Sequence, residues 1–550
     1  MNMIAATPLS PRRLLALATL FLANPVLAAE APQQADAPAA QAAAPAAANA
    51  AEQAEGRFDV MEFQVEGNTV LPAVEIETAV YPFLGQGKAI QDVEQARGAL
   101  EKTYHAAGYL TVLVDIPEQD VANGMVRLKV TEATVSRLRV VGSRYYSLGK
   151  IREAAPSLSE GGVPYFPAVQ KELAALNTAP DRRVTPVLRA GKSPGTVEVD
   201  LKVDDKPPLH GSIELNNRYS PNTTRTRLAA MLRYDNLWQR QHSLTLNAQV
   251  APENIKDSNV LSASYLMPLT PETMLAAYAV RSRSDVATTG SMNVIGNGDI
   301  YGLRAIFSLP SRQNLFHSLT LGADYKSFGE TLVLQGADSI NTPITYVPMM
   351  ALYSATLPGK KGVTQYNMGI TFALRGLFGN NEADFENKRY KAHANFFVLK
   401  GDVQRTQNLP RGWSLFGRMD MQIASQALIS NEQFAAGGAE SVRGYLESER
   451  MGDNAVRGSL ELRAANLLSG GEGPVNQLFP LAFVEGAELR LRDPLPGQTQ
   501  RFSLASAGLG LRFKMLNGLM FDIDLARPLK DGAYTMAGDN HVHARLAYGF

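Results

Sequence analysis

Alternation of apolar and polar side chains dominates residues 207–550 and limits most strongly what this chain can fold into. About sixteen segments of about ten residues follow one another there, separated by clusters of Gly, Asn, Asp, Pro and Ser. In one of them, Met368 and Ile370 alternate with Asn367 and Thr371. Successive side chains of a strand point to opposite faces, so each segment predicts a strand with one apolar face. Helical periodicity is missing from this stretch, which predicts an all-β domain.

Two architectures are compatible with this alternation. In a soluble sandwich the apolar faces meet in a core, whereas in a membrane barrel they meet lipid and the polar faces line a wet lumen. The length of the stretch 207–550, and the Tyr, Phe and Trp residues near many strand ends, favour the barrel. After the N-terminal region the sequence has no uninterrupted apolar run of about 18 residues, so a helical membrane protein is not expected.

The first 56 residues predict export rather than a folded domain. Residues 1–28 are typical of a secretory signal, because Arg12 and Arg13 precede a short apolar run and cleavage is expected after Ala28. A short anchor helix is the alternative interpretation, which an early Asn and Pro disfavour. Residues 29–56 are mostly Ala, Pro, Gln and Glu and predict a linker, with a short plug helix as the minority interpretation.

Composition excludes several classes of function. The chain has 53 basic and 53 acidic residues, and this balance argues against a general nucleic-acid partner. It has no cysteine, which excludes disulfides, cysteine-ligated zinc and thiol catalysis. Two common catalytic motifs, Gly-x-Ser-x-Gly and His-Glu-x-x-His, are also missing. His541 and His543 share a predicted strand face, but two ligands are too few for a metal site. We therefore expect no enzymatic activity and no metal or cofactor.

Between the linker and the alternating segments, two small α+β units are predicted. Residues 57–133 have the order β-α-α-β-β, with helices predicted at 71–83 and 90–107. The order recurs weakly at 134–206, where Gly142 follows Gly67 by 75 residues in a similar strand-turn context. Repeats of this size imply tandem domains, although two unrelated α+β segments would give a similar pattern.

One short motif links these regions to a known family. The tetrapeptide Val442-Arg443-Gly444-Tyr445 precedes the fifth predicted strand from the C-terminal end. Together with the two α+β units before the alternating segments, it makes residues 57–550 resemble the TpsB transporters of two-partner secretion, within the BamA-type superfamily. The resemblance implies that 57–133 and 134–206 are POTRA domains and that 207–550 form a transmembrane β-barrel of about sixteen antiparallel strands.

The resemblance also assigns roles to particular residues. In the family, a loop carrying the tetrapeptide folds back into the barrel, and its arginine pairs with the carboxylate of a Phe-x-Asp-x-Gly motif. The matching stretch here is Phe483-Val484-Glu485-Gly486-Ala487, in which Glu replaces Asp and Ala replaces Gly. Arg443, Phe483 and Glu485 are therefore the expected loop anchor, although two ordinary lumen charges are the alternative. Tyr548 and Phe550, on the final strand, are the expected C-terminal assembly signal.

The function implied is an outer-membrane translocation pore. It would recognise an unfolded partner protein in the periplasm through its POTRA domains and export it without nucleotide hydrolysis. The strand 110–116 with the helix 90–107 is one candidate cargo surface. Expected partners are a secreted β-helical protein (an adhesin, haemolysin or toxin), the barrel-assembly machinery and outer-membrane lipids. An outer-membrane protein assembly factor of the same superfamily and a passive porin are the alternatives.

Overall fold

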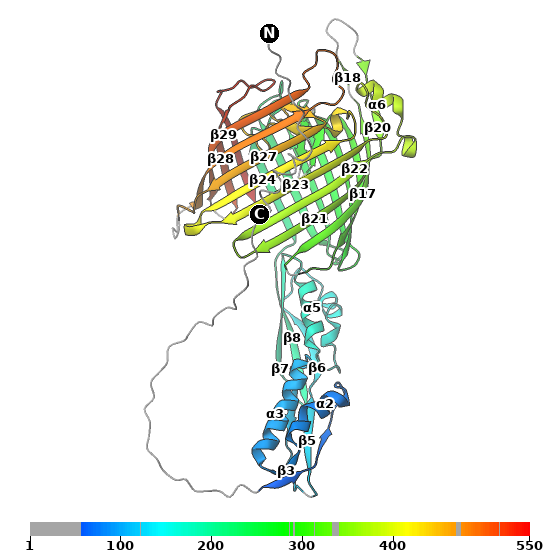
Figure 1. Cartoon of the computed structure of the whole chain (residues 1–550), viewed down its shortest axis with the longest axis vertical. Coiled ribbons are helices and arrows are strands. Elements are labelled where there is room, and N and C mark those ends of the chain that lie inside the picture. Colours follow the sequence, from blue (N-terminus) through cyan, green and yellow to red (C-terminus); the bar gives the residue numbers. More distant parts are fainter. Residues whose placement is uncertain are drawn as a thin grey trace, which may run out of the picture. The chain divides into compact units, whose positions relative to one another are not determined.

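The computed structural model describes residues 57–550 except 122, 285, 290–291, 313, 330, 333–339, 469–474 and 516–517 (Figure 1). The predicted signal and linker, 1–28 and 29–56, lie outside the described residues. Between 57 and 550, the described elements are two small α+β units followed by a closed antiparallel barrel. The predicted fold class is therefore confirmed.

The first α+β unit is built around a three-stranded sheet in the order β2-β5-β4, with β2 and β5 parallel and β4 antiparallel to β5. One face of α3 packs on this sheet, because its buried side chains Val93, Leu100 and Tyr104 contact the same core as Val112 and Leu128. Its elements are β1 (Phe58–Val60), β2 (Glu62–Glu66), α2 (Ala73–Val80), η1 (Tyr81–Phe83), β3 (Gly85–Lys88), α3 (Ile90–Ala106), β4 (Val112–Asp115) and β5 (Met125–Glu132).

The second unit repeats this plan with the sheet order β6-β8-β7, again with its first and last strands parallel. Its core is a separate apolar cluster that includes Ile151, Leu158 and Leu201. The elements are β6 (Thr134–Val141), α4 (Leu148–Glu153), η2 (Pro156–Leu158), α5 (Phe166–Leu176), β7 (Arg182–Ala190) and β8 (Thr196–Asp205). The helix α4 is too short to give a periodic signal, and the sequence did not predict it.

The two glycines that suggested the repeat have the same structural task. Gly67 and Gly142 end the first strand of each unit with φ of +89° and +93°. A Cβ at either position would collide with a backbone carbonyl oxygen of the neighbouring strand, at Val130 and Val203 respectively. Only glycine allows both this positive φ and this close approach, so the matching positions reflect a common backbone requirement.

A carboxylate at the end of the last strand closes the turn that follows each glycine. Asp205 accepts hydrogen bonds from the N–H groups of Arg144 and Tyr145, both at 2.9 Å, and from the Ser143 hydroxyl at 2.8 Å. Burial tends to raise the pKa of Asp205, but these hydrogen bonds outweigh it, and the pKa lies below its ordinary value. Glu132 binds the corresponding turn of the first unit through the N–H groups at 69–70.

The barrel has sixteen strands in its described residues, counting β20 and β21 as one because both pair with β17. Every neighbouring pair is antiparallel, and β31 closes the barrel on β9. The strands are β9 (Leu209–Asn216), β10 (Arg227–Leu237), β11 (His242–Val250), β12 (Ser258–Pro268), β13 (Thr273–Ser284), β16 (Gly298–Ser308), β17 (Phe316–Phe328), β20 (Ile344–Tyr346), β21 (Met349–Gly359), β22 (Gly362–Phe372), β23 (Phe397–Asn408), β24 (Ser414–Ala424), β27 (Asn454–Arg463), β28 (Val475–Arg490), β29 (Arg501–Met515), β30 (Leu519–Pro528) and β31 (His541–Gly549).

The faces of these strands separate as the alternation predicts. In β9, Ile213 and Leu215 are 56% and 45% exposed, whereas Glu214 between them pairs with Arg545 of β31. Apolar side chains thus point out of the barrel, and charged side chains line its interior. Among the helices of the described residues, none is long and apolar enough to cross a membrane.

Long connections at one end of the barrel carry further ordered elements. They are β14 (Val286–Thr289), β15 (Met292–Ile295), β18 (Thr331–Leu332), β19 (Ile340–Asn341), η3 (Leu377–Gly379), α6 (Glu382–Lys388), η5 (Ser430–Glu432), β25 (Phe434–Ala436) and β26 (Arg450–Gly452); η4 (Pro410–Gly412) lies in the short turn between β23 and β24. The sequence predicted no helix here. In α6 the Asn381 side chain caps the first turn by accepting the N–H of Ala383, which stabilises a helix too short to show periodicity.

A buried carboxylate joins several of these connections. Asp453 is fully buried and pairs with Arg389, which follows α6, at 2.5 Å. It also accepts the backbone N–H groups of Leu428 at 3.0 Å and Arg492 at 2.7 Å. Three connections that are far apart in sequence therefore meet at one side chain, which gives this end of the barrel a fixed arrangement.

Candidate functional site

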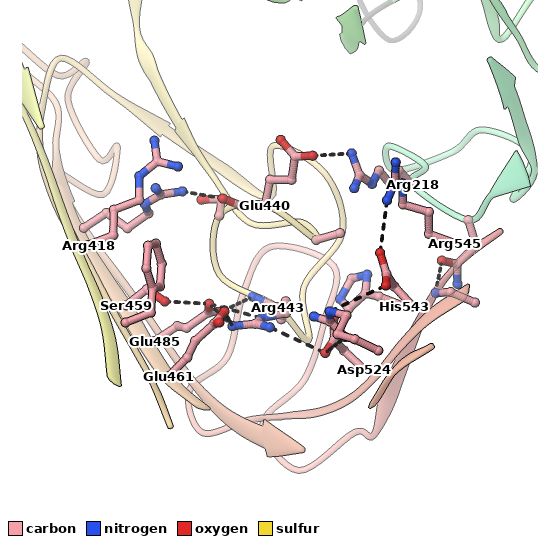
Figure 2. A pocket seen from close by; sticks show the side chains of 18 residues that line it. Arg218, Arg418, Glu440, Arg443, Ser459, Glu461, Glu485, Asp524, His543 and Arg545 are labelled. Atoms are coloured by element: carbon pink, nitrogen blue, oxygen red, sulfur yellow. Dashed lines mark hydrogen bonds and ion pairs between the residues drawn. The ribbon is translucent and has the colours of Figure 1, made fainter. Parts of the chain in front are cut away.

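The tetrapeptide Val442-Arg443-Gly444-Tyr445 lies in the loop 437–449, between β25 and β26. The side chains of Val442, Arg443 and Tyr445 are almost completely buried. Gly444 has φ +95°, a conformation that favours glycine and reverses the chain at this point. The loop contacts inward-facing side chains of β27 to β31, so it lies within the barrel lumen (Figure 2).

Arg443 and Glu485 are brought together by this arrangement. The Arg443 guanidinium donates to Oε1 of Glu485 through Nη2 at 2.6 Å and Nε at 3.1 Å. The backbone N–H of Arg443 donates to the second oxygen, Oε2, at 2.7 Å. Both oxygens of Glu485 are thus occupied by one loop residue, and the hydroxyl of Ser459 adds a further bond at 3.0 Å. A charge-assisted, multiply bonded contact of this kind fixes position as well as distance.

Two further carboxylates surround Arg443 that the sequence did not single out. Glu461 of β27 lies 2.6 Å from Nη2, and Asp524 of β30 lies 3.5 Å from Nη1. Each has a second basic partner: Arg463 binds Glu461 at 2.7 Å and Arg512 binds Asp524 at 2.9 Å. With Glu485 the six side chains carry three positive and three negative charges, so the buried cluster is electrically balanced.

The aromatic ring of Phe483 packs against the Arg443 guanidinium. The Arg443 carbon Cζ lies 3.5 Å from the centroid of the Phe483 ring, in cation–π contact. Gly508 of β29 is paired with Phe483 across the sheet. A Cβ on Gly508 would overlap this ring and the carbonyl oxygen of Leu525, so glycine provides the space in which the ring lies under Arg443.

Glu485 and Ala487, which replace the Asp and Gly of the family motif, both fit the structure around the loop. The longer side chain of Glu485 still reaches the guanidinium and the loop backbone. Ala487 is buried and packs in one apolar cluster with Val442 and Tyr445, so its methyl group fills space against the loop without preventing the approach.

The remaining loop residues are anchored on neighbouring strands. The Tyr445 hydroxyl lies 2.7 Å from the carbonyl oxygen of Lys530 and accepts the N–H of Ala505 at 3.2 Å. The N–H of Gly444 donates to Nε2 of His543 at 2.9 Å, so this nitrogen is unprotonated when the loop is docked. His543 therefore anchors the loop, and the neighbouring His541 lies beside it with ring centroids 4.6 Å apart.

Beside the cluster, a polar cavity of about 220 Å³ remains open in the lumen. Its lining includes Arg218, Arg418, Arg457 and Arg545 together with acidic residues of the cluster (Figure 2). The loop is held only by ion pairs, hydrogen bonds and packing, all of which can be broken and reformed. The site can therefore act as a reversible obstruction of the lumen.

The C-terminal residues Tyr548 and Phe550 lie at the seam of the barrel rather than near this cluster. Phe550 exchanges two backbone hydrogen bonds of 3.0 Å with Gly211, and its ring covers the position that a Cβ of Gly211 would occupy. Tyr548 pairs with Ile213 and is 46% exposed on the outer face. The last residues thus take part in closing β31 on β9.

The two outer strands of the first unit's sheet differ in whether their backbone groups are free to pair with another strand. On β4, the Val112 carbonyl is bonded by His105 at 3.1 Å, and the Val114 N–H and carbonyl are bonded by Glu101 at 3.3 Å and Arg97 at 3.4 Å. All three side chains come from α3, so this edge is covered. On β2, the edge opposite β5 has no strand partner in the described part of the chain.

Each edge of the second unit is engaged at part of its length. On β6, the N–H of Leu138 donates to Glu160 at 3.1 Å. On β7, Val184 is bonded through its N–H and carbonyl to the Asn177 side chain, at 2.6 and 3.0 Å. Within the first unit, β2 is thus the more open of the two edges to another chain.

A closed barrel preceded by POTRA-type units defines an outer-membrane transporter, with the POTRA units in the periplasm. The family described as POTRA domain, ShlB-type, matches residues 58–133. The family described as haemolysin secretion/activation protein ShlB/FhaC/HecB matches residues 195–513, which is more than half of the chain. The chain belongs to this ShlB/FhaC/HecB family, and the predicted resemblance to the TpsB transporters is confirmed.

Curated relatives agree with this assignment. The outer membrane transporter CdiB of Dickeya dadantii is 22% identical over 407 residues, covering 72% of this chain and 70% of the relative. The heme/hemopexin transporter protein HuxB of Haemophilus influenzae is 21% identical over 416 residues, covering 71% and 69%. The family is one of transporters, and a secretion/activation transporter is the function class it indicates.

Solved structures share the fold. CdiB from Escherichia coli superposes with a TM-score of 0.62 at 19% identity, covering 92% of this chain and 93% of the other. BamA from Haemophilus ducreyi, lacking POTRA domains 1–3, superposes with a TM-score of 0.53 at 14% identity, covering 90% of this chain and all of the other. At these identities the likeness concerns architecture alone, and the family match rather than the fold favours transport over barrel assembly.

Proposed function

We propose that this protein binds an unfolded partner protein in the periplasm and exports it through the barrel without hydrolysing nucleotide. The observation that carries the proposal is a closed sixteen-stranded barrel whose lumen holds a loop fastened only by non-covalent contacts around Arg443. A loop that closed the lumen permanently would not need to be held by ion pairs and hydrogen bonds that can break and form again. A reversible obstruction suits a pore that must open for a chain and close behind it.

The cargo would be recognised by strand addition to β2. An extended peptide gains main-chain hydrogen bonds at an open sheet edge, and neighbouring side chains provide selectivity. On β4 the equivalent groups are taken by side chains of α3, which moves the candidate surface from the strand 110–116 to Glu62–Glu66. Glu62, Gln64 and Glu66 are exposed there, so a cargo strand with basic or polar residues at alternate positions fits best.

Cargo entry would then release the loop at Arg443 and Glu485. A polypeptide in the lumen brings its own polar groups and water to the cluster, which weakens the ion pairs that hold the loop. Transport would draw on binding to the periplasmic units and on folding of the cargo outside the cell. A secreted, β-helical partner of the adhesin, haemolysin or toxin type fits this scheme, because its folding would prevent return.

Assembly of the transporter itself would use the end of the chain. Tyr548 lies on β31, the strand that closes the barrel, and Phe550 directly follows it; a terminal aromatic at such a strand is suited to recognition by the barrel-assembly machinery. The outer apolar faces would then be solvated by outer-membrane lipid.

The first test compares proteins released into the medium by cells with and without this gene. One or a few large secreted proteins should disappear from the medium and return on complementation. An unchanged set of secreted proteins, with altered abundance of other barrels in the membrane, would instead support an assembly function and overturn export.

The second test maps the cargo surface. The chain has no cysteine, so a single cysteine introduced by Gln64→Cys on β2 gives one defined cross-linking position, and Leu113→Cys on β4 is the matched control. Both positions are exposed. The cargo should cross-link to position 64 and not to position 113. Cross-linking at 113 alone would show that β2 is not the docking edge.

A further inference from the structure

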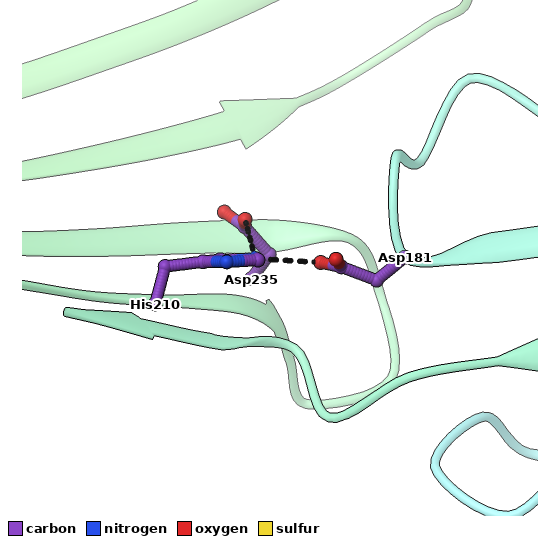
Figure 3. Close-up of side chains that lie close together, drawn as sticks. All are labelled: Asp181, His210 and Asp235. Carbon is purple, nitrogen blue, oxygen red and sulfur yellow. Dashed lines mark hydrogen bonds and ion pairs between the residues drawn. The ribbon is translucent and has the colours of Figure 1, made fainter. Parts of the chain in front are cut away.

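Three side chains that could bind a metal ion converge where the second α+β unit meets the barrel (Figure 3). Nε2 of His210 lies 2.8 Å from Oδ2 of Asp181 and 3.5 Å from Oδ2 of Asp235. One ligand atom from each residue lies within 4.8 Å of the others. Asp181 is only 7% exposed, so its carboxylate is held inside the protein and is not one of several mobile surface charges.

The backbone holds all three residues in place. His210 of β9 is paired with Arg233 of β10, and Asp235 lies two residues further along β10 on the same face of the sheet. The N–H of Asp235 donates to the carbonyl of Pro208 at 2.8 Å. Asp181 directly precedes β7, and its carbonyl accepts the N–H of Lys206 at 2.8 Å. Little rearrangement is needed to keep these three groups facing one another.

The donor set matches what divalent transition metals prefer. An imidazole nitrogen and carboxylate oxygens are atoms that bind zinc, and three protein ligands leave the fourth position for a water. With bonds of about 2.0–2.2 Å in tetrahedral geometry, neighbouring donors lie about 3.4 Å apart. The spacing of 3.5 Å between His210 and Asp235 is close to this value, whereas His210 and Asp181, which are hydrogen-bonded at 2.8 Å, would have to move apart by about 0.6 Å to bind the same ion. His210 and Asp235 are about a quarter exposed, which leaves the ion a route from solvent.

An outer partner supports the same assignment. Nε of Arg233 donates to Oδ2 of Asp235 at 3.0 Å, which fixes this carboxylate and leaves Oδ1 as the oxygen that can bind an ion. Arg233 offsets the charge of one of the two carboxylates, and the negative charge of the other remains. An ion bound to all three residues would offset this remaining charge and join residues of two separate folding units.

We propose that Asp181, His210 and Asp235 bind one divalent transition-metal ion, with zinc as the best match. The ion fastens the start of β7 in the second POTRA-type unit to β9 and β10 of the barrel. Its role is to restrict motion at this junction. The site shares no residue with the loop cluster, so it is independent of the proposed gate.

A second group of His and Glu residues provides the internal control. Glu382, Glu386 and His393 also lie close enough to share an ion. As at the junction site, where Nε2 of His210 is hydrogen-bonded to Asp181, the imidazole here is hydrogen-bonded to a carboxylate: Nδ1 of His393 lies 2.5 Å from Glu382, whose second oxygen accepts the N–H of Ala394 at 2.9 Å. Glu386 is exposed, so this group lacks the buried carboxylate that marks the junction site.

The test measures zinc binding to the full-length protein, purified without a histidine tag and treated with a chelator. Titration calorimetry should give one zinc per chain, X-ray absorption should show only nitrogen and oxygen donors, and zinc should raise the melting temperature. His210→Ala should weaken binding at least about tenfold, whereas His393→Ala should leave it unchanged.

Three results would overturn the proposal. Absence of zinc binding to the wild-type protein at micromolar concentrations would leave the three residues as a plain ion-pair group. Binding lost in His393→Ala and kept in His210→Ala would assign the ion to the other group. If His210→Ala does not fold, judged by its gel mobility before and after heating, Asp235→Asn replaces it, and unchanged affinity in that variant counts against the site.

Discussion

Replacing Arg443 by alanine should release the loop 437–449 from the lumen while leaving the barrel assembled. The strands are held by backbone pairing that does not involve this side chain, whereas the loop depends on it. In the variant, the backbone N–H of residue 443 can still reach Glu485, but both guanidinium bonds to that carboxylate are lost. The cation–π contact with Phe483 is lost as well.

The loss of docking free energy depends on which carboxylates lose their basic partner in the variant. Glu461 keeps Arg463 and Asp524 keeps Arg512, so Glu485 alone among the three is left without a basic partner in the described residues. Removing one member of a buried ion pair costs about 3–5 kcal/mol. Water entering the lumen will solvate Glu485, so we use the lower limit of about 3 kcal/mol, which corresponds to roughly a hundredfold weaker docking.

Single-channel recording in planar bilayers and limited proteolysis measure this directly. The variant should show larger or more frequent openings, and a protease should cut 437–449 faster than in the wild type. Secretion of the cargo should fall, because the loop no longer returns to a defined position. Arg281→Ala is the matched control, since Arg281 pairs with Asp299 at 2.8 Å but is 64% exposed and contributes little.

Wild-type conductance, proteolysis and secretion in Arg443→Ala would refute the reasoning, because the loop would then be held without its central charge. Equal changes in Arg281→Ala would refute it in another way, by showing that any arginine removed from the barrel has this effect. Arg443→Lys should give an intermediate result, since lysine keeps the charge but not the fork of donors.

Three other perturbations test separate parts of the structure. Gly508→Ala should push Phe483 from beneath the guanidinium at a cost of about 1–3 kcal/mol and reproduce part of the gating change in bilayer recordings. Because folding lowers the pKa of Asp205, its carboxylate stabilises the second unit at pH values above the unfolded pKa of about 3.9, and this stabilisation is lost as pH falls through the lower folded pKa. Urea unfolding followed by the helical circular dichroism signal should show this loss. In Asp205→Asn the free energy of unfolding should depend less on pH in the acidic range. Asp453→Asn should loosen the connections that meet at Arg389, and cleavage after residue 389 by trypsin should become faster.

Strand positions were largely predictable from the sequence because side chains of a strand alternate between lipid and lumen. The alternation around Met368, for example, falls within β22 as expected. Register was not predictable, since a shift of two residues preserves every face. Alternation is compatible with a lumen-facing position for Glu461 and Asp524, yet only the observed register and the position of the loop bring both to Arg443.

The pairing of Arg443 with Glu485 was predicted from a family motif and not from side-chain periodicity or composition. Arg443 and Glu485 are 42 residues apart, and neither periodicity nor composition links them. The roles of His543 and Asp453 were missed for a related reason: each is defined by contacts from segments distant in sequence. The short helices α4 and α6 were missed because fewer than two turns give no measurable period.

The parallel pairing of first and last strands has a mechanical consequence for both periplasmic units. In each unit the chain runs through one strand of the pair near the start of the unit and leaves on the other. The two strands share five residue pairs in β2–β5 and seven in β6–β8. A pull along the chain, such as a tethered cargo would exert, therefore acts in shear. All the bonds between the two strands must stretch together rather than open one by one, so each unit should transmit tension to the barrel without unravelling.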